Sequence, residues 1–376
     1  MHVLQASDGD FFKRVDKHYH TSHCLCAGCT AGTDSSSDFT QVPSGGGSLP
    51  SALTVLPSNG AFDIVLNPNA TLAGNAPALA AFERAAASWE SFISDPITVN
   101  LDVGLQSLDP GVLASASSVL LTAGYDTIRN QMVFDSSFEA DDGIVASLPT
   151  FSQSSFSINS GFSTTSSLTS NKATLKAMGF TGLDGLFGAT DATINFSTNF
   201  GFDFDNSDGV GGGLIDFETV ALHEIGHALG FTSSVDTVDF FDSQASPGAV
   251  TPRALDLFRF ADGTEPLDDA SFTTATRSLD ANAAAGFSDT ELEAAMSTGR
   301  FTGDGRQASH WKDNNLTGTL VGIMDPTLAP RQVVGLDALD LRALDVIGYD
   351  ITFVPEPSTL WLAAGSLLLI YRRRRS

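Results

Sequence analysis

Apolar residues recur at helical spacing in three segments of the chain, which are residues 75–92, 216–230 and 337–348. In the first segment Asn75 stands at the N-cap position and Pro77 in the first turn, an arrangement typical of a helix start. In the last segment Gly348 follows the final apolar residue and is expected to end the helix. The pattern therefore predicts three amphipathic helices that are far apart in the sequence.

A different periodicity predicts short strands between the first two helices. Residues 97–103 alternate apolar and polar side chains, as a strand with one buried face does, and residues 193–197 form a second candidate strand. Residues 152–170 are rich in Ser, Thr and Phe without such alternation, and we expect an exposed loop or irregular hairpin there. Residues 203–213 are rich in Asp and Gly and are expected to form a loop before the second helix.

Composition narrows the classes of protein that this chain can belong to. The 376 residues are 42% hydrophobic, enough for a packed core, and no internal repeat is visible. The net charge is -25, from 19 basic and 44 acidic residues, which excludes nucleic acid as a partner because phosphate binding needs a basic face. All three cysteines lie within residues 24–29, so no disulfide is expected in the main domain.

The second predicted helix carries His223, Glu224 and His227. Histidines four residues apart face the same way on a helix, and two neutral imidazoles at that separation can bind one Zn²⁺. Glu224 is rotated by about 100° from His223, so its carboxylate can reach a zinc-bound water without binding the metal. Zinc lowers the pKa of such a water, and a carboxylate takes its proton as the water attacks a peptide carbonyl. The spacing predicts a catalytic zinc site, against the alternative of a helix with merely buried or solvated histidines.

A catalytic zinc normally has three protein ligands and one open position. In compact metzincins the third ligand is a histidine six residues after the second, but residue 233 of this chain is Ser. A glutamate is equally poorly supported, because the first one after Glu224 is Glu265, which precedes a proline outside any helical pattern. The third ligand must therefore come from further along the chain.

His310 is the economical third ligand, because four of the seven histidines lie at or before residue 23. It stands before Trp311 and a short way ahead of Met324, which lies in a predicted tight turn at residues 322–326. We predict that Met324 lies beneath the metal. The alternatives are a surface histidine beside a partly buried tryptophan and an ordinary core methionine.

These motifs occur in the order found in the leishmanolysin-type metzincins, which the chain resembles. His-Glu-x-x-His-x-x-Gly-Phe at residues 223–231 is followed by a long insertion at 232–309, then Ser-His-Trp, then a Met-turn before Pro. The resemblance covers roughly residues 76–349 in the order of elements and is specific at 222–231 and 309–326. The insertion contains no cysteine, unlike the disulfide-rich insertion of that family, so substrate preference is not implied.

The resemblance implies an α+β, metzincin-like fold. A mixed twisted sheet and the active-site helix would be followed by an irregular C-terminal subdomain that contains the Met-turn. It also implies zinc bound by His223, His227 and His310, with Glu224 as general base and Met324 as a hydrophobic floor.

Two weaker signals concern other metal sites. Asp203, Asp205 and Asp208 resemble part of a calcium loop, but no Glu completes the pattern, and a solvated acidic loop is the alternative. Residues 1–50 form a leader with a His/Cys tract that is either disordered or pro-like, with a thiolate that caps the catalytic zinc.

Residues 351–376 form a separate tail, in which Pro355, Glu356 and Pro357 precede an apolar run and an arginine cluster. This pattern resembles the PEP-CTERM signal of Gram-negative bacteria, which an exosortase reads; a plain short membrane anchor is the alternative. The implied partners are an exosortase-type enzyme and, before processing, the membrane. The protein is then exported to the cell envelope or beyond, and because no signal peptide is visible at Met1 we expect the true N-terminus upstream.

The residues together predict an exported zinc endopeptidase with residues 51–350 as its catalytic domain and a protein or peptide as substrate. The alternative is a cell-surface or matrix protein with a non-catalytic metal site. Glu224 argues against this alternative, because a structural site has no use for a general base.

Overall fold

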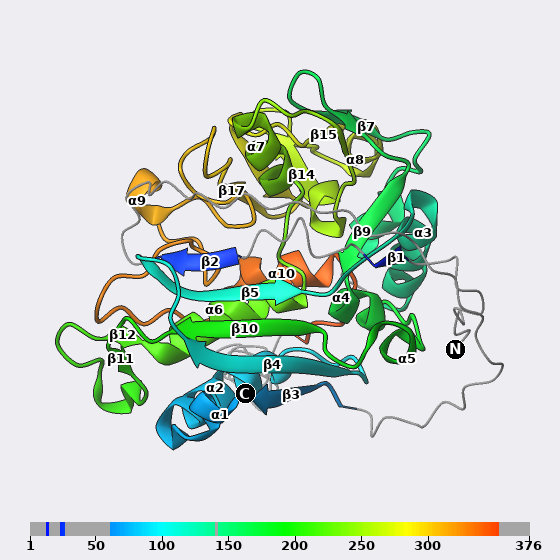
Figure 1. The fold of residues 1–376 in the computed structure, drawn as a ribbon. Coiled ribbons are helices and arrows are strands. Elements are labelled where there is room, and N and C mark those ends of the chain that lie inside the picture. Colours follow the sequence, from blue (N-terminus) through cyan, green and yellow to red (C-terminus); the bar gives the residue numbers. More distant parts are fainter. Residues whose placement is uncertain (1–12, 15–22, 27–60, 140–141, 353–376) are drawn as a thin grey trace, which may run out of the picture.

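The computed structural model describes residues 13–14, 23–26, 61–139 and 142–352 (Figure 1). Its main sheet has five strands in the order β2-β5-β10-β4-β3. These are β2 (His23–Cys26), β3 (Asp63–Pro68), β4 (Thr98–Gln106), β5 (Val112–Ser118) and β10 (Ala192–Ser197). Strands β3, β4 and β10 run parallel, whereas β5 and β2 pair antiparallel at one edge. The sheet is therefore mixed, as predicted.

Two long helices cover this sheet. Helix α2 (Ala76–Glu90) begins at the predicted cap Asn75 and packs against β3 and against α6 (Phe217–Leu229). Helix α6 lies against β5, β10 and β2. Its buried side chains surround the whole helix, which explains why it is apolar on every side. Figure 1 shows α6 behind the strands β5 and β10.

A three-stranded sheet forms from segments in which the sequence predicted no strands. Strand β9 (Ser167–Asn171) pairs with β6 (Leu120–Gly124), which also pairs with β1 (Lys13–Arg14). The expectation of an exposed loop at residues 152–170 is wrong here, because Leu168, Thr169 and Ser170 are buried. Ser and Thr satisfy the ladder through their backbone, so the strand lacks the apolar alternation that would reveal it.

The insertion also differs from the irregular subdomain expected. Four of its strands join β7, which precedes the insertion in the chain, in a five-stranded sheet of order β17-β16-β14-β15-β7. These strands are β7 (Ser155–Ser157), β14 (Arg259–Ala261), β15 (Thr276–Ser278), β16 (Ala285–Ser288) and β17 (Glu293–Met296). In Figure 1 this sheet lies above the main one, beside α7 (Val235–Ser243) and α8 (Asp269–Thr274). Each strand has only three or four residues, too few for a periodic signal.

The remaining elements connect these layers. The short helices are α1 (Ala70–Ala73), α3 (Tyr125–Asp135), α4 (Lys172–Ala177), α5 (Leu183–Phe187), α9 (Asn314–Thr317) and α10 (Ala338–Asp345). Two-stranded pairs are formed by β8 (Ser163–Thr164) with β13 (Ala249–Val250), and by β11 (Phe202–Asp203) with β12 (Ile215–Asp216). Helix α10 follows its N-cap Asp337, where a helix start was predicted, but it ends at Asp345 and not at Gly348. One buried cluster of apolar side chains joins it to α2, α6 and the main sheet.

Within the predicted leader, the structure describes the backbone of β1 and β2, which pair with β6 and β5. The remainder of residues 1–50 lies outside the described part of the chain, as does the tail from residue 353.

Candidate metal centre

Three histidines from two distant segments meet at one point. The Nε2 atoms of His227 and His223 are 3.1 Å apart, and each lies 3.2 Å from Nε2 of His310. All three side chains are buried. The first two lie on α6, whereas His310 lies in the loop that follows β17. The fold therefore brings a residue from beyond the insertion to the helix.

The other ring nitrogen of each histidine faces a backbone carbonyl. Nδ1 lies 2.7 Å from Ile323 O in His223, 2.8 Å from Phe231 O in His227 and 3.0 Å from Gln307 O in His310. A carbonyl only accepts, so each Nδ1 must carry the proton and donate it. In a neutral ring the Nε2 then bears the lone pair, and three lone pairs point at one another.

Three acceptors at this separation repel one another unless a cation lies among them. A tetrahedral zinc with bonds of about 2.0–2.1 Å holds its nitrogen ligands about 3.3 Å apart, close to the separation here. Burial lowers the pKa of His223 to about 3, with a contribution from His310, and burial lowers that of His310 to about 4. The neutral rings therefore form a donor set that fits a divalent metal such as zinc.

Helix α6 is shaped around this point. Glu224 follows the first histidine and is fully buried. A Cβ added at Gly226 would lie 2.5 Å from Sδ of Met324, so the glycine lets the methionine approach the helix between the two histidines. Met324 is fully buried, and Trp89 of α2 donates its indole N–H to Leu222 O at 3.0 Å. The structure thus places Met324 against α6 at Gly226, the residue before His227.

Buried carboxylates hold the segment that carries His310. Asp236, in the first turn of α7, accepts hydrogen bonds from Ala308 N at 2.6 Å and from Ser309, through both its N–H and its hydroxyl. Ser233, at the position where a third histidine was absent, donates its N–H to Ser309 Oγ at 2.8 Å. Ser233 therefore helps to hold the segment that carries His310.

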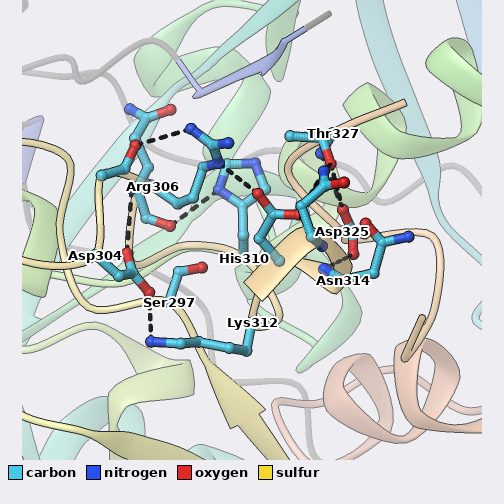
Figure 2. Close-up of polar contacts among 12 residues, drawn as sticks. Ser297, Asp304, Arg306, His310, Lys312, Asn314, Asp325 and Thr327 are labelled. Atoms are coloured by element: carbon cyan, nitrogen blue, oxygen red, sulfur yellow. Dashed lines mark hydrogen bonds and ion pairs between the residues drawn. The ribbon is translucent and has the colours of Figure 1, made fainter. Parts of the chain in front are cut away.

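Ion pairs brace the same loop on its outer side. Figure 2 shows Arg306 beside the carbonyl that orients His310, and Lys312 paired with Asp304 at 2.7 Å. Arg306 pairs with Asp313 at 2.6 Å. The loop is thus fixed before and after the histidine.

Asp340 of α10 is the residue that the sequence analysis missed. Its carboxylate accepts from Trp311 Nε1 at 2.7 Å, Ile323 N at 2.7 Å, Asp337 N at 2.9 Å and Met324 N at 3.3 Å. Burial raises its pKa to about 6, although these hydrogen bonds oppose the shift. In the sequence it looks like the third residue of a capping box at the start of a helix, and nothing there indicates the turn that it binds.

The predicted calcium residues bond locally. Asp203 accepts from Asp205 N at 3.1 Å and from Gly211 N at 2.8 Å, and Asp205 accepts from Ser207 N at 3.2 Å. Within the described ranges, Asp203, Asp205 and Asp208 are not among the groups of three or more ligand atoms that lie within 4.8 Å of one another. These hydrogen bonds stabilise local turns of the loop.

A separate carboxylate cluster lies near the C-terminal end of the described chain. Ligand oxygens of Asp135, Glu139 and Asp350 lie within 4.8 Å of one another. Burial, followed by the charges of Asp350 and Asp142, raises the pKa of Asp135 from 3.8 to about 8. Burial and the neighbouring Asp350 raise that of Glu139 to about 10. The folded protein therefore holds protons here at neutral pH.

Comparison with known proteins identifies the tail alone. Residues 353–375 match the PEP-CTERM protein-sorting motif. No curated protein and no solved structure matches the chain. The motif marks an exported protein of Gram-negative bacteria that an exosortase-type enzyme sorts through its C-terminal tail. Pro355, Glu356 and Pro357 fall within the match but outside the described residues; in the described part, no helix is long and apolar enough to cross a membrane.

Proposed function

We propose that this protein is an exported zinc-dependent endopeptidase of the leishmanolysin-like metzincin type. The observation that carries the proposal is the triangle of three unprotonated Nε2 atoms beside Glu224 on α6. Three histidine ligands leave the fourth position of a tetrahedral zinc open, which is the arrangement of catalytic sites. A structural site would use a fourth protein ligand instead.

The residues of the chain supply the remaining parts of the reaction. Zinc, when bound, would lower the pKa of a water and polarise the peptide carbonyl. Glu224 accepts the proton of the attacking water and passes it to the nitrogen of the leaving amine. His223, His227 and His310 keep their orientation through the three carbonyls that bind their Nδ1 atoms. Glu224 is the only one of these residues whose removal should leave the metal in place.

The test compares the wild type with Glu224→Gln and His310→Ala on a denatured, unstructured protein substrate. We expect the wild type to contain one zinc per chain and to cleave the substrate. Glu224→Gln should keep the zinc and lose about 10²- to 10⁴-fold in rate. His310→Ala should lose zinc and activity together.

Two results would overturn the proposal. Equal rates in the wild type and in Glu224→Gln would remove the general base. Full zinc occupancy without cleavage by the wild type would favour the alternative, a surface protein with a non-catalytic metal site.

A further inference from the structure

A pocket of about 410 Å³ lies near the C-terminal end of α6. Its lining includes Leu120 and Thr122 of β6, Ser234 at the start of α7, and Arg253. Ser118, two residues before Leu120, donates its hydroxyl to His227 O at 3.4 Å. Two residues of chain span at most about 7 Å, so the pocket begins close to the backbone carbonyl of His227.

The walls of the pocket combine apolar rings and hydroxyl groups. Phe162, Phe241 and Pro247 supply the apolar part, and Thr237 and Thr251 stand among the polar residues. Such a mixture encloses a side chain and leaves orientation to a few polar groups. A charged group on the wall would select a ligand of opposite charge.

Arg253 is the charged group in this lining. The residue is only 5% exposed, and its Nη1 is buried without a hydrogen-bond partner. Burial lowers its pKa, and the nearby charges of Asp256 and Asp236 oppose that shift. A buried guanidinium without a direct partner is costly, and a ligand that pairs with it recovers that cost.

The neighbouring carboxylates are engaged with other groups. Asp256 accepts from Ser233 Oγ at 2.6 Å, from Ser234 N at 3.0 Å and from the backbone N–H of Arg253 at 2.8 Å. These bonds hold the carboxylate against the turn after α6. In the described part of the chain no carboxylate oxygen forms an ion pair with the Arg253 side chain.

Arg342 shows what a fully paired buried arginine looks like in the same protein. Its guanidinium lies within 2.6 Å of oxygens from Asp142, Asp289 and Asp345. The chain has 44 acidic residues against 19 basic ones. Among the described residues, Arg259 and Arg277 are also buried without a carboxylate partner, but of these arginines only Arg253 lines this pocket.

We propose that this pocket binds a carboxylate of the peptide substrate through Arg253. The inference rests on the proposed peptidase function and adds a substrate class to it. An extended peptide advances about 3.3 Å per residue, so the pocket would receive a group at one particular number of residues from the scissile bond. The carboxylate is either an acidic side chain or the C-terminus of a short peptide, and both offer the planar pair of oxygens that a guanidinium binds.

The experiment uses ten-residue fluorogenic peptides with blocked ends, in which one Glu is scanned through the positions and compared with Gln. We expect the wild type to prefer Glu over Gln at one position by about tenfold to a hundredfold in kcat/KM, mainly through KM. In Arg253→Met the Glu/Gln ratio at that position should fall to about one. Arg253→Lys, which keeps a charge but not the bidentate fork, should give an intermediate ratio.

A second arm compares free-acid and amidated peptides that contain no acidic residue. A preference for the free acid that depends on Arg253 assigns the pocket to the substrate C-terminus instead of a side chain. A Glu/Gln ratio near one at every position, with no preference for the free acid, overturns the proposal, and so does a preference that persists in Arg253→Met. The ratio is measured within each variant, so partial loss of folding does not mimic the result.

Peptide binding to an inactive variant tests the pocket independently of peptidase activity. Labelled Glu and Gln peptides are titrated into Glu224→Gln, and anisotropy reports their Kd values. If the Glu peptide binds more tightly and Arg253→Met removes the difference, the pocket is supported even when the wild type cleaves nothing. If the wild type cleaves peptides but both bind alike, the peptidase stands and the carboxylate pocket fails.

Discussion

Single residues around the metal centre act mainly by holding other residues. Asp340 binds four donors and ties Trp311, which follows His310, to the Ile323–Met324 turn. Ile323 O in turn fixes the ring of His223. Gly322 leaves the space for this carboxylate, because a Cβ there would lie 2.4 Å from Asp340 Oδ2. One buried carboxylate therefore orients residues that are far apart in the sequence.

Asp340→Asn tests this arrangement. An amide keeps one acceptor oxygen and turns an NH₂ group toward N–H donors, so we expect a loss of about 1–3 kcal/mol in the free energy of unfolding. The variant should also release zinc to a chelator about tenfold more readily. Asp337→Asn is the matched control, because Asn caps a helix about as well as Asp does. Equal melting temperatures and chelation rates for the two variants would contradict the assignment.

At the scale of elements, the end of α6 is capped by tertiary contacts. Asn171 at the end of β9 donates to His227 O at 2.9 Å and to Ala228 O at 3.2 Å. Thr174 Oγ1 and Tyr349 Oη donate to Leu229 O at 2.6 and 2.7 Å. The helix limits at Asp216 and Gly230 were predictable from local signals, whereas these partners were not, because they come from strands and helices elsewhere.

Strand β2 covers the edge of the main sheet beside this helix. It pairs antiparallel with β5, with Leu25 opposite Ala114, and it also packs against α6. Without β2, β5 would present a free edge to which an extended peptide can add as a strand. We therefore predict that the leader competes with substrate.

Leu25→Pro removes an N–H from β2 and should weaken this pairing. We expect a lower KM for unstructured substrates and an unchanged kcat. A variant with Cys24, Cys26 and Cys29 all changed to Ser keeps the strand and removes the thiolates, so it separates strand pairing from metal capping. An unchanged KM in Leu25→Pro would argue against competition, and a gain only in the triple Ser variant would assign inhibition to the thiolates.

At the scale of the whole molecule, the excess of acidic residues affects stability through the Asp135, Glu139 and Asp350 cluster. Burial and the neighbouring carboxylates raise the pKa of Asp135 to about 8 in the folded protein, from the 3.8 that is usual for an aspartate in water. Between about pH 4 and pH 8 the folded state holds a proton that the unfolded chain has released. The stability from this group is thus full below about pH 4 and is lost as pH rises toward 8.

Asp135→Asn should remove the part of the pH dependence that comes from Asp135. We expect its melting temperature to exceed that of the wild type at pH 8 and to approach it near pH 4, where the carboxyl is neutral in both states. Asp109→Asn, a change at an exposed position, is the control and should shift the melting temperature by a similar small amount at every pH. A constant difference between Asp135→Asn and the wild type across that range would show that the carboxyl is not protonated in the folded state.

Features that depend on neighbours along the chain could be predicted from the amino-acid sequence. Helical spacing and caps predicted α2, α6 and the start of α10, although α10 ends at Asp345, before the expected stop at Gly348. Alternation predicted β4, and residues 193–197 were also expected to form a strand, which is β10. The position of His223, Glu224 and His227 on one helix also follows from the period of 3.6 residues. The sorting motif could also be identified from the sequence, because it consists of consecutive residues.

Contacts between residues that are far apart in the sequence could be seen only in the folded chain. In the folded chain, His310 and Met324 lie against α6 across the insertion. The sequence had indicated His310 by the number of histidines and by its order before the Met-turn, but neither signal gives a distance. The tertiary structure also showed Asp236 and Asp340 holding that segment and Arg253 lining a pocket, which no local pattern distinguishes from surface charges. Burial and hydrogen bonding set the roles of such groups, and both depend on elements that are distant in the sequence.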